Sequence, residues 1–166
     1  MKKPLLDITP INACYLAGFF DGEGCVGIYE RSVANSGQGA VNPYCSLTVC
    51  ISNTNHEVLA HIQKTCGGII TNGSQDWYPP LKGGGLRKTL WRWSAQSREG
   101  AHLLKAMLPY LIVKREQALV ALEYYAISST RNSKPHPGRS GQPPLTEEEL
   151  KERRRLIHKI RDLKRH

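Results

Sequence analysis

The carboxylate of Glu23 stands between two glycines, at the end of the stretch YLAGFFDGEG that spans residues 15–24. A glutamate carboxylate is a hard oxygen ligand of the kind that Mg²⁺ prefers, and the Gly22 carbonyl beside it is another. Glycines of this kind end helices, so Glu23 is expected at the tip of one. What chemistry this acid can do depends on the elements that bring other groups to it.

The element that carries Glu23 is a predicted helix, capped by Thr9 and opened by Pro10. At helical spacing it has a bulky face and a small face. The bulky face holds Ile11, Tyr15, Leu16, Phe19 and Phe20, and the small face holds Cys14, Ala17, Gly18 and Asp21. A glycine inside a helix costs about 1 kcal/mol relative to alanine. An ordinary amphipathic helix explains the bulky face, whereas the small face predicts close packing against a second helix.

Residues 16–24 resemble, position by position, the signature of the LAGLIDADG homing endonucleases, with Glu23 at its last acidic position. The chain holds one copy and no internal repeat, so it is similar to the single-motif type. The resemblance implies an intron-encoded homodimer joined through Cys14, Ala17, Gly18 and Asp21. It also implies a Mg²⁺ site formed by Glu23 and the Gly22 carbonyl, with the two Glu23 side chains brought together.

The resemblance implies two further site residues. The segment 109–117, PYLIVKREQ, is similar to the family's second recognisable stretch and places Lys114 as its active-site lysine. Asn53 falls where the family has a side chain that positions water. As structural alternatives, Lys114 is a surface lysine at a helix N-terminus, where a cation is disfavoured, and Asn53 is a turn residue. Glu57 stands near where some relatives have a basic residue.

Periodicity along the chain predicts an α+β fold. Alternating patterns predict strands over 25–31, 44–52, 68–74 and 89–96, with long loops over 32–43 and 75–88. Helices are expected between Asn55 and Gly67, from a capping Ser97 to about 109, and over 114–127. The order is an αββαββα core whose four-stranded antiparallel sheet has one apolar face for the helices and one open polar face. Such a sheet suits a saddle.

The resemblance implies that this polar face lies in the major groove of double-stranded DNA, whose base edges it reads. From the pattern alone, a merely solvated face is the safer interpretation. The candidate DNA-binding residues are Tyr29, Arg31, Tyr44, Ser46, Thr48, Cys50, Arg87, Lys88, Arg92, Ser94 and Gln96.

Charge favours a polyanionic partner, because the net charge of the 166 residues is +9. The sequence divides into a core over 1–127, a Pro/Gly linker over 128–144 and a basic C-terminal helix over 145–166. A capping box from Thr146 to Glu149 opens that last helix. Its cations are either simply solvated or in contact with phosphates.

The five cysteines are odd in number and show no CxxC pair, and no signal peptide or long apolar run accompanies them. We therefore expect free thiols, no membrane segment and an intracellular location, in cytoplasm, nucleoid or organelle matrix.

The sequence is compatible with two functions. One is a homodimeric, Mg²⁺-dependent endonuclease that makes double-strand cuts at a long pseudo-palindromic DNA site. The other is a binding module of the same fold, an RNA maturase or a regulator without cleavage. Glu23 and Lys114 together favour the enzyme. A nonspecific basic protein would not explain the paired glycines.

Overall fold

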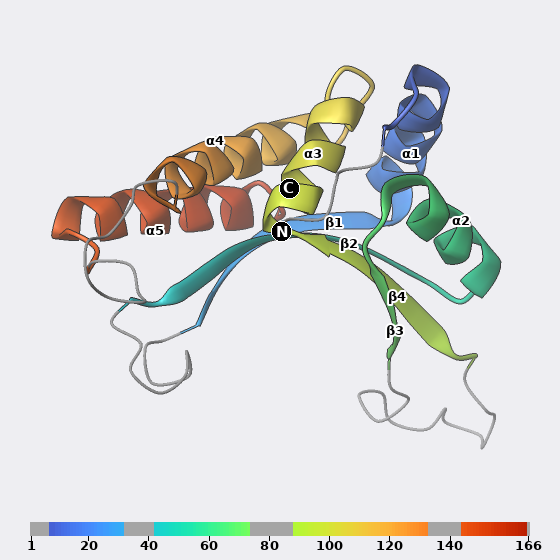
Figure 1. The fold of residues 1–166 in the computed structure, drawn as a ribbon, viewed down its shortest axis with the longest axis horizontal. Coiled ribbons are helices and arrows are strands. Elements are labelled where there is room, and N and C mark those ends of the chain that lie inside the picture. The colour runs from blue at the N-terminus through green and yellow to red at the C-terminus, as the bar shows by residue number, and fades with distance from the viewer. Residues whose placement is uncertain (1–6, 32–41, 74–87, 133–143, 166) are drawn as a thin grey trace.

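The computed structural model describes residues 7–31, 42–73, 88–132 and 144–165. Four antiparallel strands form one sheet in the order β1-β2-β4-β3, and the helices lie over one of its faces (Figure 1). The elements are α1 (Pro10–Glu23), β1 (Gly24–Arg31), β2 (Tyr44–Asn53), α2 (His56–Cys66), β3 (Ile69–Gly73), β4 (Leu90–Gln96), α3 (Ser97–Met107), α4 (Arg115–Asn132) and α5 (Glu147–Asp162). The strands curve away from the helices toward both ends, so the other face is open and concave.

The α+β class and the order of elements confirm the fold expected from the sequence. The expected start of the linker at 128 is wrong, because α4 continues to Asn132. The hydroxyl of Ser128 donates to the Tyr124 carbonyl at 2.8 Å, and that of Thr130 donates to the Ala126 carbonyl at 2.9 Å. Both hydroxyls bond to carbonyls four residues earlier in the same helix, so these residues belong to the last turns of α4. At α3 the N-cap is Gln96 rather than Ser97, and no side chain caps it.

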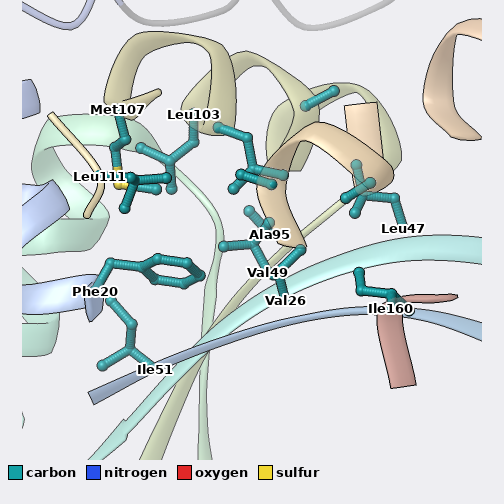
Figure 2. Packing of buried hydrophobic residues seen from close by; sticks show 14 of the residues in the cluster. Phe20, Val26, Leu47, Val49, Ile51, Ala95, Leu103, Met107, Leu111 and Ile160 are labelled. Atoms are coloured by element: carbon teal, nitrogen blue, oxygen red, sulfur yellow. The ribbon is translucent and has the colours of Figure 1, made fainter. Parts of the chain in front are cut away.

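The core lies between the sheet and the helices. Inward positions alternate along the strands, and Val26, Val49 and Trp93 are all 0% exposed. Phe20 of α1, also 0% exposed, packs into the same layer, and Figure 2 shows it beside residues of the sheet and of α3. The period of two in the strands therefore predicts the buried face correctly.

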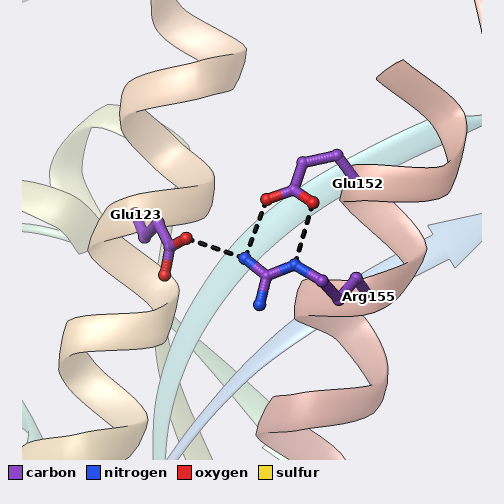
Figure 3. Close-up of polar contacts among 3 residues, drawn as sticks. All are labelled: Glu123, Glu152 and Arg155. Carbon is purple, nitrogen blue, oxygen red and sulfur yellow. Dashed lines mark hydrogen bonds and ion pairs between the residues drawn. The ribbon is translucent and has the colours of Figure 1, made fainter. Parts of the chain in front are cut away.

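The C-terminal helix α5 is part of this core rather than a separate element. Leu156, Ile157 and Ile160 are at most 2% exposed and belong to the single buried cluster. At the surface, Arg155 bridges Glu123 of α4 at 2.9 Å and Glu152 at 2.7 Å (Figure 3). Exposed ion pairs contribute at most about 1 kcal/mol, so α5 is held mainly by its apolar stripe.

No helix in the described ranges combines the length and the apolar character needed to span a membrane.

Candidate functional site

Glu23 is the last residue of α1 and is exposed. The helix ends there because Gly24 turns into an extended conformation, with φ −82° and ψ 161°. A Cβ at Gly24 would come within 2.0 Å of the Phe20 ring, so the chain passes directly over a buried side chain at this point. Only glycine allows that approach, and it leaves Glu23 at the junction between the helix and the first strand.

Asp21 joins the end of α1 to the segment that precedes α4. Its carboxylate accepts hydrogen bonds from the backbone N–H groups of Ile112 at 2.7 Å, Val113 at 3.1 Å and Lys114 at 2.9 Å. Burial alone would raise the pKa of Asp21, but these N–H groups and the Lys114 ammonium together hold it below its ordinary value. Both carboxylate oxygens are used within the chain.

Lys114 is brought to the same end of α1 as Glu23. Its ammonium donates to the backbone carbonyl of Asp21, two residues before Glu23. The expectation of a cation beside this acid therefore has a geometric basis, although Lys114 still lies at a helix N-terminus. A lysine is unfavourable at a helix N-terminus, and the negative charge of Asp21 offsets this because it lies against the backbone N–H groups that precede α4.

Asn53 ends β2 at the same edge of the sheet. Gly24, directly after α1, pairs with Ile51, and Asn53 lies two residues further along β2, paired with Trp91 of β4. Its side-chain oxygen accepts a hydrogen bond from the Asn55 N–H at 2.8 Å. The turn role considered for Asn53 is therefore present, and its amide N–H₂ group remains for other contacts.

An open hollow of about 620 Å³ lies beside this junction. It is lined by Gly24, Cys25, Ile112, Val113, Lys114, Glu116, Gln117, Leu163 and Lys164. Two lysines from distant parts of the sequence thus share one hollow next to Glu23. Nothing in the sequence pattern linked Lys164 to this site.

Several of the expected DNA-binding residues are exposed on the concave face. Tyr29 is 47% and Tyr44 51% exposed, and Lys88, Arg92 and Gln96 are exposed as well. Ser94 is half-buried on the same face. Arg31 lies in β1, but its side chain is outside the described part of the structure, and so is all of Arg87.

Three other expected contacts are corrected by the structure, because Ser46, Thr48 and Cys50 are only 6%, 7% and 6% exposed. They lie on β2, an interior strand. Ser46 stands opposite Tyr29, and Thr48 stands opposite Gln96. These short side chains lie low between longer neighbours, so a polar position on the open face is not necessarily an accessible one.

The third strand supplies candidates that the sequence analysis missed. Ile69 and Thr71 pair with Ser94 and Arg92, so they share the concave face with them. Ile69 is 64% exposed, and Thr71 is exposed. Ile69 was not chosen because it is apolar, although the period-two pattern, with the partly buried Ile70 as its neighbour, could have indicated its side.

The residues expected at a dimer interface divide into two groups. Cys14 and Gly18 are exposed, but Ala17 is 0% exposed within the chain's own core and Asp21 is occupied by the hydrogen bonds above. Ala17 is therefore no surface residue, and the expectation for it is wrong. The bulky face is also divided, since Ile11 is 82% and Tyr15 49% exposed. The side of α1 that faces the core is therefore not the side predicted from the sizes of its residues.

Two thiols lie opposite one another where β1 begins. Cys25 pairs with Cys50 in the register, and all five cysteines are free. The hydrogen bond from Cys50 lowers the pKa of Cys25 despite burial, with Lys164 and Arg92 adding to the effect. The same contact and burial raise the pKa of Cys50. Arg92 donates to Cys50 Sγ at 3.1 Å.

Few donors at the end of α1 are available to a metal. Within the described residues, no three His, Cys, Asp or Glu side chains gather closely enough to hold a metal ion. Glu23 and the Gly22 carbonyl are oxygen donors suited to a hard cation, whereas Asp21 is already occupied. One chain therefore offers one available carboxylate at this point, which fits half of a metal site.

These elements define an α+β protein with an open-faced antiparallel sheet and an acid and a lysine at the end of its first helix. No protein-family model matches the sequence, and no curated protein is detectably similar to it. Solved structures do match. The homing endonuclease I-CvuI, in complex with its target in the presence of calcium, is 20% identical, covers 93% of this chain and 82% of its own, and has a TM-score of 0.64.

The archaeal intron-encoded homing endonuclease I-Vdi141I, complexed with DNA, is 18% identical over 92% of this chain and 84% of its own, with a TM-score of 0.66. The I-LtrWI LAGLIDADG homing endonuclease, bound to target DNA, is 16% identical over 96% of this chain, with a TM-score of 0.60. This chain spans 47% of that one. The chain therefore has the fold of the LAGLIDADG homing endonucleases, as its motif led us to expect.

Proposed function

We propose that this protein is a site-specific DNA endonuclease that hydrolyses phosphodiester bonds as a metal-dependent homodimer. The observation that carries the proposal is the junction of Glu23 and Lys114 through Asp21, at the edge of an open polar sheet. The structures of I-CvuI and I-Vdi141I, both complexes with DNA, have the same fold and support the choice of partner.

Glu23 and the Gly22 carbonyl are the groups that would hold Mg²⁺. The metal, when bound, supplies a Lewis acid that polarises the phosphate and activates water. I-CvuI structures were determined with magnesium or calcium present, which supports a divalent cation. Because each chain contributes one available carboxylate, a second chain is needed to complete the ligand set.

The chain's own polar groups do the remaining work. The Lys114 ammonium, held on the Asp21 carbonyl, is placed to neutralise charge that develops on the phosphate. The amide of Asn53 is a candidate to orient water, since its oxygen is fixed in a turn and its N–H₂ group is left to donate. Each group is fixed through backbone contacts, so little reorganisation is needed when DNA binds.

Two glycines of α1 support the homodimer. A Cβ at Gly18 or at Gly22 would meet no heavy atom of the described residues within 4 Å beyond the helix's own backbone. Each glycine costs about 1 kcal/mol in a helix, and no contact among the described residues requires either. Close approach of a second α1 explains both. The exposed Ile11, Tyr15, Ile112 and Val113 would extend that contact.

The concave face would read a long, pseudo-palindromic site, one half per chain. Major-groove readout needs donors, acceptors and apolar groups at spaced positions of a ribbon. The candidates on the described face are Tyr29, Tyr44, Ile69, Thr71, Lys88, Arg92 and Gln96.

A plasmid-library cleavage assay tests this proposal. The purified protein is incubated with a randomised-site library with Mg²⁺, with Ca²⁺ or with a chelator, and linear products are sequenced. Double-strand cuts at one pseudo-palindromic sequence, with Mg²⁺ and not with chelator, are expected. Specific capture of a DNA or RNA sequence without cuts in any metal would instead mean a binding module of the same fold.

A further inference from the structure

The turn that follows α5 lies against the start of the first strand. Lys164 Nζ lies 3.3 Å from Cys25 Sγ, although the two residues are far apart in sequence. The Gln117 side chain donates to the Leu163 carbonyl at 3.3 Å, which ties this turn to α4. The ammonium of Lys164 is thereby held at the hollow that Lys114 also lines.

The sheet leaves room for this ammonium. A Cβ at Gly27 would come within 3.3 Å of Lys164 Nζ and 3.1 Å of the Tyr29 ring. Gly27 lies on the concave face, since it pairs with Thr48 between the outward positions of Cys25 and Tyr29. The missing side chain therefore allows a cation from the helical layer to reach the edge of the open face.

The Cys25 contact does not use the full hydrogen-bonding capacity of Lys164. An ammonium has three donors, and the contact with Cys25 Sγ occupies one of them. Lys164 is exposed, whereas Arg154, Arg155 and Arg165 of the same segment are each near a carboxylate. The position suits an ammonium that faces an anion arriving from solvent.

We propose that Lys164 binds a DNA backbone phosphate at the cleavage centre, beside the phosphate that Lys114 serves. This inference rests on the proposed nuclease function and gives α5 a specific role in it. The apolar stripe of Leu156, Ile157 and Ile160 anchors the helix, and its last turn delivers the cation. The C-terminal end of a helix also favours a positive charge.

The test compares Lys164→Gln with Lys159→Gln, which makes the same chemical change on an exposed lysine of α5 outside the hollow. Single-turnover cleavage of the recovered site should slow on the order of tenfold or more for Lys164→Gln, and Lys164→Arg should restore most of the rate. The slope of log K against log salt should fall by about 0.9 for Lys164→Gln. Equal rates and salt slopes for the two glutamine variants would overturn the inference.

Gly27→Ala gives a second, independent test because it displaces the ammonium while keeping the charge. The single variant should slow cleavage, and the double variant with Lys164→Gln should be no slower than Lys164→Gln alone. Additive losses would show that Gly27 acts through Tyr29 and not through Lys164. Circular dichroism at each variant's working temperature confirms that the fold is kept.

Failure of the nuclease proposal is distinguishable from failure of this one. If the wild-type protein cuts no DNA, the salt slopes are measured on a long mixed-sequence duplex. A slope lowered only for Lys164→Gln would still support phosphate binding at this position. Matching slopes for Lys164→Gln and Lys159→Gln would reject it even without catalysis.

Discussion

Asp21 Oδ1 accepts a hydrogen bond from the backbone N–H of Lys114 at 2.9 Å, across 93 positions of sequence. This bond joins the helix that carries the acid to the residue that carries the cation. The relative position of Glu23 and Lys114 is therefore fixed by a third residue. Asp21 acts as the positioning group, and it contributes to folding as well.

Replacing Asp21 by asparagine should destabilise the protein. The amide keeps the shape but loses the charge and one acceptor, and a hydrogen bond to a charged group contributes about 1.5–3 kcal/mol. Urea unfolding at neutral pH measures the difference. Asp162→Asn is the matched control, since its carboxylate is 66% exposed and pairs only with Arg165 among the contacts described. Equal losses for both variants would contradict the capping role.

The wild type and Asp21→Asn should differ less in unfolding free energy at acid pH than at neutral pH. The pKa of Asp21 is lowered in the folded state, so its contribution is fully present above the ordinary carboxyl value of about 4. It is lost as the pH falls through the lower folded value. Unfolding free energies of the wild type and Asp21→Asn should therefore converge below about pH 4. A gap that stays constant with pH would mean that the charge of Asp21 is irrelevant.

Glu23→Gln should abolish cleavage and leave specific DNA binding unchanged. The substitution removes a metal ligand at an exposed position and no groove contact. Glu116→Gln is the control, because Glu116 is an exposed carboxylate that lines the neighbouring hollow. We expect a rate loss on the order of a hundredfold or more for Glu23→Gln and less than a few-fold for Glu116→Gln. Similar rates for both variants would remove Glu23 from the site.

The sequence predicted the strands and their buried side because a period of two needs only local residues. It did not predict accessibility on the other side, since Thr48 is buried beside its partner Gln96 in the neighbouring strand β4, which no local pattern reveals. The hydrogen bond between Asp21 and Lys114 could not be predicted either, because a contact between residues so far apart in sequence leaves no periodic pattern. The motif located the acid, and tertiary contacts decided what surrounds it.

The orientation of α1 was also not predictable from its sequence alone. Side-chain size suggested that Ala17 faces outward and Tyr15 inward, and the structure reverses both. A helix with apolar residues on most sides carries a weak amphipathic signal, so side-chain size alone cannot orient it. Gly18 was the better guide, because it is exposed and has open space around it among the described residues.

Gly18→Leu should convert the protein to a monomer without unfolding it. The monomer has open space at this position, so the fold tolerates the side chain. In a symmetric dimer two leucines would separate the helices, and overpacking costs about 1–3 kcal/mol per site. The dimer dissociation constant should rise on the order of a hundredfold. Sedimentation without DNA measures it, with Lys151→Leu on α5 as control, and an intact Gly18→Leu dimer would refute the interface.

The concave face offers a test that separates exposed from buried polar residues. Arg92 is exposed and lies 3.1 Å from Cys50 Sγ, while Thr48 is 7% exposed on the same face. An arginine bidentate to guanine contributes about 1–3 kcal/mol of discrimination. Arg92→Ala should therefore relax the preference at one base pair in each half-site, symmetrically, with a smaller loss of overall affinity.

Thr48→Val is the matched control, because it changes a hydroxyl to a methyl group at nearly constant volume. Since Thr48 is only 7% exposed, opposite Gln96, loss of its hydroxyl should leave base preference unchanged. Cleavage of every single-base variant of the recovered target gives both profiles. A change with Thr48→Val and none with Arg92→Ala would mean that DNA binding rearranges this face, and that exposure in the free protein is no guide to the bases it reads.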